Sequence, residues 1–148
     1  MYISIYYISN KHNYRLNKAF KRLGGRIVTV RSFEKESIAR RFYRVKIVIK
    51  VKKMSLNTLV HEYGHFLYYL KKVYLDNKWT NIYYAERNKV SYLIKRNFIT
   101  KSSSEYLAES YANYRINPNE LKKTRPRTYQ YINDKATTIT NNDITKNR

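Results

Sequence analysis

Residues 59–66 read LVHEYGHF, within a segment, residues 55–72, whose apolar side chains recur with helical spacing. That spacing predicts a helix with one apolar stripe directed toward a core. His61 and His65 are four positions apart, so both imidazoles leave the same helix face and can ligate one Zn²⁺ ion. Glu62 follows the first histidine and can act as general base toward a metal-activated water. The alternative is an amphipathic helix whose histidines merely lie at the surface.

Two histidine nitrogens need a third protein ligand to make an open catalytic site. The chain has no cysteine and no histidine after His65, which leaves the later acids: Asp76, Glu86, Glu105, Glu109, Glu120, Asp134 and Asp143. Glu105 and Glu109 are the best pair, because they share one face of a second predicted helix, residues 102–115. One would bind the metal and the other would accept a ring N–H of a ligand histidine. Alternatively, Ser102 and Glu105 form a capping box and Glu109 is a solvated charge.

Composition limits the class of protein. The chain has 148 residues, 43% of them hydrophobic, which fits one folded domain. Lysine and arginine number 31 against 10 acidic residues, a net charge of +21, and residues 1–53 hold 15 basic and 2 acidic side chains. This balance attracts nucleic acid, anionic membrane surfaces or acidic substrates. No segment approaches the ~20 apolar residues of a membrane span, and no signal peptide is recognised.

The first third of the chain predicts strands around one helix. Short strands are expected at residues 2–8 and 26–30, and a helix over residues 13–23 that two glycines end. Residues 42–52 alternate between apolar side chains and lysine, which is the clearest strand pattern. The row of lysines predicts that this strand lies near a sheet edge.

The sequence after residue 75 indicates several helical segments separated by less regular ones. Residues 76–101 are expected to be irregular or weakly helical, and residues 117–120 have the signature of another helix start. A short final turn is expected at residues 126–132. The domain therefore covers residues 1–134, and residues 135–148 are expected to form a polar, frayed tail.

Several stretches together carry a family resemblance. LVHEYGHF is preceded by the strand YRVKIVIKVKK and followed by SSSEYLAESYANYRINP at residues 102–118 and RPRTYQYIND at residues 125–134. Over roughly residues 13–134, the chain resembles the catalytic domain of the anthrax lethal factor family and the related clostridial Pro-Pro endopeptidases. The resemblance implies an α+β fold, a compact zincin-like domain. It would hold a small mixed twisted sheet, an HExxH active-site helix and a second helix that bears the glutamates.

The same resemblance implies the roles of the site residues. Zinc would be bound by His61, His65 and Glu105, with Glu109 in contact with a ligand histidine. Glu62 would be the general base of a zinc metalloendopeptidase of the gluzincin type, which hydrolyses peptide bonds with a metal-activated water.

Two further expectations concern catalysis and substrate. The family carries a tyrosine seven residues before the ligand glutamate, and its hydroxyl helps to stabilise the oxyanion; Phe98 stands there in this chain. Loss of one such donor typically costs about 10²–10³ in rate. An extended substrate is expected to lie along the edge strand, beside Val45, Ile47 and Ile49. The lysines of that strand fit an acidic peptide or protein substrate.

A binding module is the alternative from another functional class. The basic first third of the chain, interleaved with tyrosine, would hold nucleic acid or another anionic partner, and the zinc site would be vestigial or inactive. In either case we expect a monomer in the cytoplasm, since the absence of cysteine fits a reducing compartment. Secretion or delivery by another route stays open.

Overall fold

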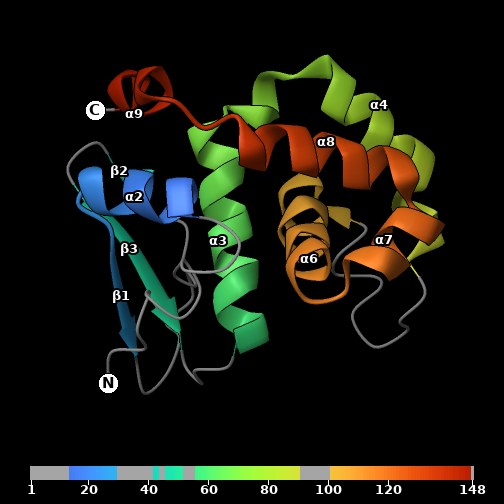
Figure 1. Ribbon diagram of the computed structural model, residues 1–148, viewed down its shortest axis with the longest axis horizontal. Coiled ribbons are helices and arrows are strands. Elements are labelled where there is room, and N and C mark those ends of the chain that lie inside the picture. The colour runs from blue at the N-terminus through green and yellow to red at the C-terminus, as the bar shows by residue number, and fades with distance from the viewer. Residues whose placement is uncertain (1–13, 30–41, 44–45, 52–55, 91–100, 148) are drawn as a thin grey trace.

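The computed structural model describes residues 14–29, 42–43, 46–51, 56–90 and 101–147 (Figure 1). Its elements, in chain order, are α2 (Tyr14–Arg22), β1 (Arg26–Thr29), β2 (Phe42–Tyr43), β3 (Lys46–Val51), α3 (Leu56–Leu70), the 3₁₀ turn η1 (Val73–Leu75), α4 (Asn77–Glu86), the 3₁₀ turn η2 (Arg87–Lys89), α6 (Ser103–Ile116), α7 (Pro118–Thr124), α8 (Pro126–Thr137) and α9 (Asn141–Lys146). The strand expected at residues 2–8 lies outside the described residues. Among the helices described, none is long and apolar enough to cross a bilayer.

The expected α+β class is wrong, because the described part of the chain is predominantly helical. Helices α3 and α6 contain 15 and 14 residues, whereas the three strands contain 4, 2 and 6. Figure 1 shows α3 and α6 side by side at the centre, α8 across the upper end of α6, and the strands to one side. The long helices carry the apolar surface that has to be buried, so helix-on-helix packing organises the domain instead of a sheet.

The strands pair in the order β1-β3-β2. Strand β1 runs parallel to β3, with Arg26 opposite Val48, and β2 runs antiparallel to β3, with Tyr43 opposite Lys46. The described residues within 42–52 therefore belong to two antiparallel strands, β2 and β3, and not to the single strand that the alternation predicts. The sequence predicts that the strand now seen as β3 lies near a sheet edge. In the described sheet β3 is instead the middle strand, between β1 and β2, so this prediction is wrong.

Buried apolar side chains form two clusters on different sides of α6. The first joins α2, α3 and the C-terminal segment; its largest members are Leu16, Phe20, Leu59, Tyr63, Phe66, Leu67 and Tyr111. The second lies under α4; its members are Val73, Trp79, Ile82, Tyr83, Val90, Tyr106, Leu107 and Tyr131. Helix α6 contributes to both clusters, which explains why eight consecutive residues, 105–112, are buried in it.

The crossing of α3 and α6 depends on a glycine in the middle of α3. A Cβ added at Gly64 would lie 2.6 Å from Ala108 Cα and 2.8 Å from its carbonyl oxygen. Glycine costs about 1 kcal/mol in a helix relative to alanine, so its presence here reflects the close approach of the two backbones. The contact brings the histidine face of α3 against the glutamate face of α6.

The C-terminal half is more ordered than its composition predicts. Residues 77–86 form α4, with Asp76 as the N-cap whose side chain accepts the N–H of Lys78. The expected final turn is the 12-residue helix α8. The expected frayed tail is wrong for residues 135–147, because α9 begins with a complete capping box between Thr140 and Asp143. Ile139 and Ile144 are buried, 6% and 4% exposed, so this polar segment packs through a few well-placed apolar side chains.

Candidate metal centre

The first turns of α6 direct two glutamates toward α3. The hydroxyl of Ser102, the N-cap, accepts the backbone N–H of Glu105 at 3.3 Å. Glu105 and Glu109 are one helical turn apart and are only 3% and 7% exposed. Their carboxylates meet His61 and His65 of α3. The Ser102 cap and the histidine contacts therefore coexist. The alternative in which Glu105 serves only the helix start and Glu109 is a solvated charge is wrong, because Glu105 contacts both histidines and Glu109 is buried against His61.

Three short contacts join the imidazoles to the carboxylates. His61 Nε2 lies 3.0 Å from Glu105 Oε2, and His65 Nε2 lies 3.2 Å from Glu105 Oε1. His61 Nδ1 lies 2.7 Å from Glu109 Oε2. Each oxygen of Glu105 thus faces a different histidine, while Glu109 contacts the far nitrogen of His61.

The donor atoms fit a metal ion. His61, His65 and Glu105 each offer one ligand atom, and these atoms lie within 4.8 Å of one another. Bonds of about 2.0–2.2 Å at tetrahedral angles separate two zinc ligands by about 3.4 Å. The Nε2 atoms lie 3.0 and 3.2 Å from the Glu105 oxygens, close to that separation. Two imidazoles and one carboxylate also make a known three-ligand catalytic set, so this group can hold a metal ion.

Glu109 is placed to orient the first histidine. A carboxylate on one ring nitrogen of an imidazole holds the proton at that nitrogen, fixes the ring orientation and raises the basicity of the other nitrogen. With Glu109 on Nδ1 of His61, the lone pair of Nε2 is directed toward Glu105 and His65. This is the contact that the sequence predicts for a glutamate one turn after the ligand.

The carboxylates also shift the protonation of the cluster when no metal is bound. Burial disfavours the imidazolium form of His61, but its hydrogen bonds with Glu105 and Glu109 outweigh burial and raise its pKa to about 9. Burial alone would raise the pKa of Glu105, but its hydrogen bonds with His61 and His65 hold it well below the usual range. The metal-free cluster is therefore an ion-pair network at neutral pH, and a metal ion has to displace its proton.

Glu62 stands beside this cluster. It is half-buried on α3 and close enough to His61 for its charge to raise the pKa of that imidazole. Phe98 and Val45 lie outside the described residues. Ile47 and Ile49 belong to β3, where their backbones lie opposite Phe42 of β2 and Ile27 of β1.

A second buried polar cluster, not predicted from the sequence, lies on the other side of α6. The carboxylate of Glu86 accepts the N–H of Thr128 at 2.7 Å, its hydroxyl at 2.8 Å and the N–H of Arg127 at 3.3 Å. Arg125 is 1% exposed and donates to Ser110 Oγ at 3.1 Å. Pro126 at the first turn of α8 signals the helix start that Glu86 caps. Nothing local in the sequence shows that an acid 40 residues earlier would reach it.

The other acids considered as third ligands are likewise used elsewhere in the fold. Asp76 caps α4 and accepts the Tyr131 hydroxyl at 2.7 Å, and Asp143 caps α9. Asp134 accepts Gln130 Nε2 at 2.9 Å. The structure thus places Glu105 and Glu109 of α6 beside the two histidines. The other candidate acids have different partners.

Comparison with known protein families finds a match over the region that contains both helices. The family model described as anthrax toxin lethal factor, N- and C-terminal domain, matches residues 28–135, a span that includes both α3 and α6. No curated protein and no solved structure matches the chain. Since the matched region covers most of the 148 residues, the chain belongs to the anthrax toxin lethal factor family.

Proposed function

We propose that this protein is a zinc-dependent endopeptidase. The observation that carries the proposal is the convergence of His61, His65 and Glu105 on one point, with their ligand atoms within 4.8 Å of one another. A structural zinc site would normally be closed by a fourth protein ligand, whereas three ligands leave a position open for chemistry. Bound at this site, zinc would supply a Lewis acid that polarises a peptide carbonyl and acidifies water.

The residues of the chain divide the remaining work. Glu109 holds the proton on Nδ1 of His61 and so keeps Nε2 available. Glu62 accepts the proton of the attacking water and passes it to the leaving amine, the role of the glutamate in this motif. Gly64 lets α6 approach closely enough for both carboxylates to reach α3. The net charge of +21 favours acidic peptides as substrates through long-range attraction.

The test begins with metal content. We expect elemental analysis to find one zinc per wild-type chain and weaker retention in Glu105→Ala. Glu62→Gln should retain zinc yet lose about 10²–10⁴ in peptide hydrolysis, since general base catalysis is worth that much. The matched control is Glu120→Gln, an acid in α7 away from the histidines, which should retain both zinc and hydrolysis.

Two results would contradict the proposal in different ways. Wild-type protein that takes up no zinc, even after incubation with the metal, would refute the site and favour the basic binding module. Zinc uptake together with equal, background hydrolysis of a peptide library by wild type and Glu62→Gln would keep the metal site and refute the peptidase.

A further inference from the structure

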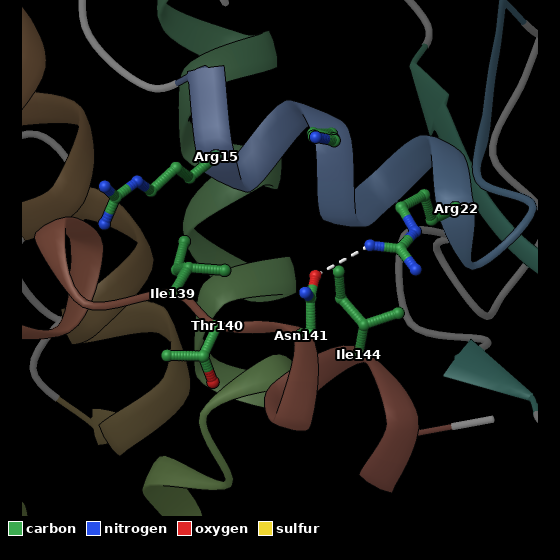
Figure 2. Close-up of a pocket in the computed structure, with 7 residues that line it drawn as sticks. Arg15, Arg22, Ile139, Thr140, Asn141 and Ile144 are labelled. Atoms are coloured by element: carbon green, nitrogen blue, oxygen red, sulfur yellow. Dashed lines mark hydrogen bonds between the residues drawn. The ribbon is translucent and has the colours of Figure 1, made fainter.

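A cavity of about 540 Å³ lies between α2 and the C-terminal segment, on residues that the metal site does not use (Figure 2). Its lining comes from one face of α2, from the chain leading into α9 and from α9 itself: Arg15, Lys18, Arg22, Ile139, Thr140, Asn141 and Ile144. Cavities of about 300–1,000 Å³ are typical of small-molecule sites. This one is large enough for a compact organic ligand.

The α2 wall of the cavity is cationic. Arg15, Lys18 and Arg22 follow one another at intervals of three and four residues, so they share one helix face over two turns, about 10 Å. The opposite face of α2, with Leu16 and Phe20, is buried in the core. Packing of the opposite face therefore places these three exposed cations on the cavity side of α2, as a row.

Neutral acceptors hold the two guanidinium groups in place. Arg15 Nη1 donates to the carbonyl oxygen of Thr137 at 3.1 Å, and Arg22 Nη1 donates to Asn141 Oδ1 at 2.8 Å (Figure 2). Among the described residues, neither arginine forms an ion pair with a carboxylate. The nearby acid, Asp143, is bound to Lys71 at 2.8 Å. The arginines are thus oriented without having their charge neutralised, which leaves it available to an anionic ligand.

The opposite wall is apolar at its base and polar at its rim. Ile139 and Ile144 line its base; they belong to the core and are only 6% and 4% exposed, so they offer a small aliphatic area. Thr140 and Asn141 add hydroxyl and amide groups. A bare anion would leave the aliphatic wall unused. A ligand with several negative charges at one end and a flat or apolar body at the other matches both walls.

We propose that this cavity binds a small polyphosphorylated compound of the size of a nucleoside diphosphate. Its phosphates would contact the row of cations on α2, since guanidinium groups match phosphate oxygens in pairs. Its body would pack against the two isoleucines. Because the ligand touches both α2 and the C-terminal segment, binding ties the two together and stabilises the fold by linkage.

Isothermal titration calorimetry with ADP, pyrophosphate and adenosine tests the proposal. Wild type should bind ADP more tightly than either part. Arg15→Gln/Lys18→Gln/Arg22→Gln should weaken ADP binding by at least about tenfold, because the variant loses the charge-assisted hydrogen bonds to the phosphates. The matched control, Lys122→Gln/Lys123→Gln/Arg127→Gln, removes the same number of exposed charges from α7 and α8 and should bind ADP like wild type.

Each other outcome overturns a stated part of the proposal. Equal weakening in both triple variants would show non-specific attraction by the net charge. Equal affinity for ADP and pyrophosphate would remove the role of the isoleucines, and absence of ADP binding by folded wild type would refute the site. Glu105→Ala should bind ADP unchanged; loss of binding there would assign the phosphates to the metal centre. Circular dichroism should show that the two triple variants fold, since their replaced side chains are exposed, and it checks the fold of Glu105→Ala, whose side chain is buried.

Discussion

Two buried carboxylate sites lie on either side of α6, and their oxygens have different partners. Toward α3, the oxygens of Glu105 are met by imidazoles of His61 and His65. On the other side, the oxygens of Glu86 in α4 accept two backbone N–H groups and one hydroxyl of α8. A backbone donor cannot be exchanged without breaking the helix start, whereas an imidazole proton can be exchanged for a metal ion. The comparison separates a carboxylate available for metal chemistry from one that is used for structure.

The largest effect should come from removing a metal ligand on the side of α6 that faces α3. Glu105→Ala removes one ligand of the metal set and should lower zinc affinity by more than about 100-fold, beyond the 10–100-fold typical of residues that only orient ligands. Competition with a chelator measures the affinity. The control is Ser110→Ala, which removes the hydrogen bond from Arg125 on the other side and should leave zinc affinity unchanged. Equal losses in the two variants would mean that α6 acts through its overall position.

A change at the Glu86 site should lower the stability of the fold and leave metal affinity unchanged. Glu86→Gln keeps the shape of the side chain but weakens acceptance of the N–H of Thr128 and Arg127. Hydrogen bonds to a charged group contribute about 1.5–3 kcal/mol, and a loss of that size lowers Tm by roughly 3–12 °C in a domain of this length. Glu120→Gln, in α7, should change Tm far less. If Glu86→Gln lowered zinc affinity without changing Tm, the distinction between the structural site at Glu86 and the metal site at Glu105 would be wrong.

A change at the contact between α3 and α6 should affect both zinc affinity and stability. In Gly64→Ala the new Cβ would meet Ala108 backbone at 2.6–2.8 Å, and backbone cannot move aside as a side chain can. Overpacking costs about 1–3 kcal/mol, partly offset by the better helix propensity of alanine. We expect a lower Tm together with weaker zinc binding.

Gly24→Ala provides the matched glycine for that experiment. A Cβ at Gly24 meets nothing within 4 Å, although its φ of +79° makes alanine strained. This variant should lose stability and keep its zinc affinity. Retention of full zinc affinity in Gly64→Ala would show that the helices can separate without disturbing the histidines.

The sequence predicts the two helices of the metal site better than their surroundings. The local signals at His61 and at Ser102 are strong because ligand spacing and helix caps are properties of a few adjacent residues. Gly64 is a further local signal: an interior helix glycine often marks a close packing contact. The mixed pairing of β3 and the helical emphasis of the fold depend on contacts between distant segments, which periodicity alone does not encode.

Other features were hidden for the same reason. Arginine is usually a surface residue, yet Arg125 is 1% exposed. Its guanidinium packs over the ring of Tyr106 and donates to Ser110 Oγ, both in α6. Residues 135–147 are mostly polar, and their burial rests on Ala136, Ile139 and Ile144. The capping box of α9 was readable from Thr140 and Asp143, but a helix of 6 residues is stable only when tertiary packing supports it.

The smallest effect concerns the ion pair that attaches α9 to the end of α3, a partly exposed counterpart of the two carboxylate sites beside α6. Burial raises the pKa of Asp143, but its hydrogen bond with Lys71, at 2.8 Å, its hydrogen bonds with Thr140 and the charge of Lys71 together outweigh burial and lower the pKa below its ordinary value. An acid with a lowered pKa stabilises the fold above its ordinary pKa of about 3.9 and loses that contribution as the pH falls through the folded-state value. Asp143→Asn should therefore lower Tm at pH 7, by an amount that corresponds to no more than about 1 kcal/mol, and the difference from wild type should shrink toward pH 3. Asp134→Asn, an exposed acid in α8, is the control with little effect at either pH. A difference that grows as the pH falls would show that the charge of Asp143 opposes the attachment of α9.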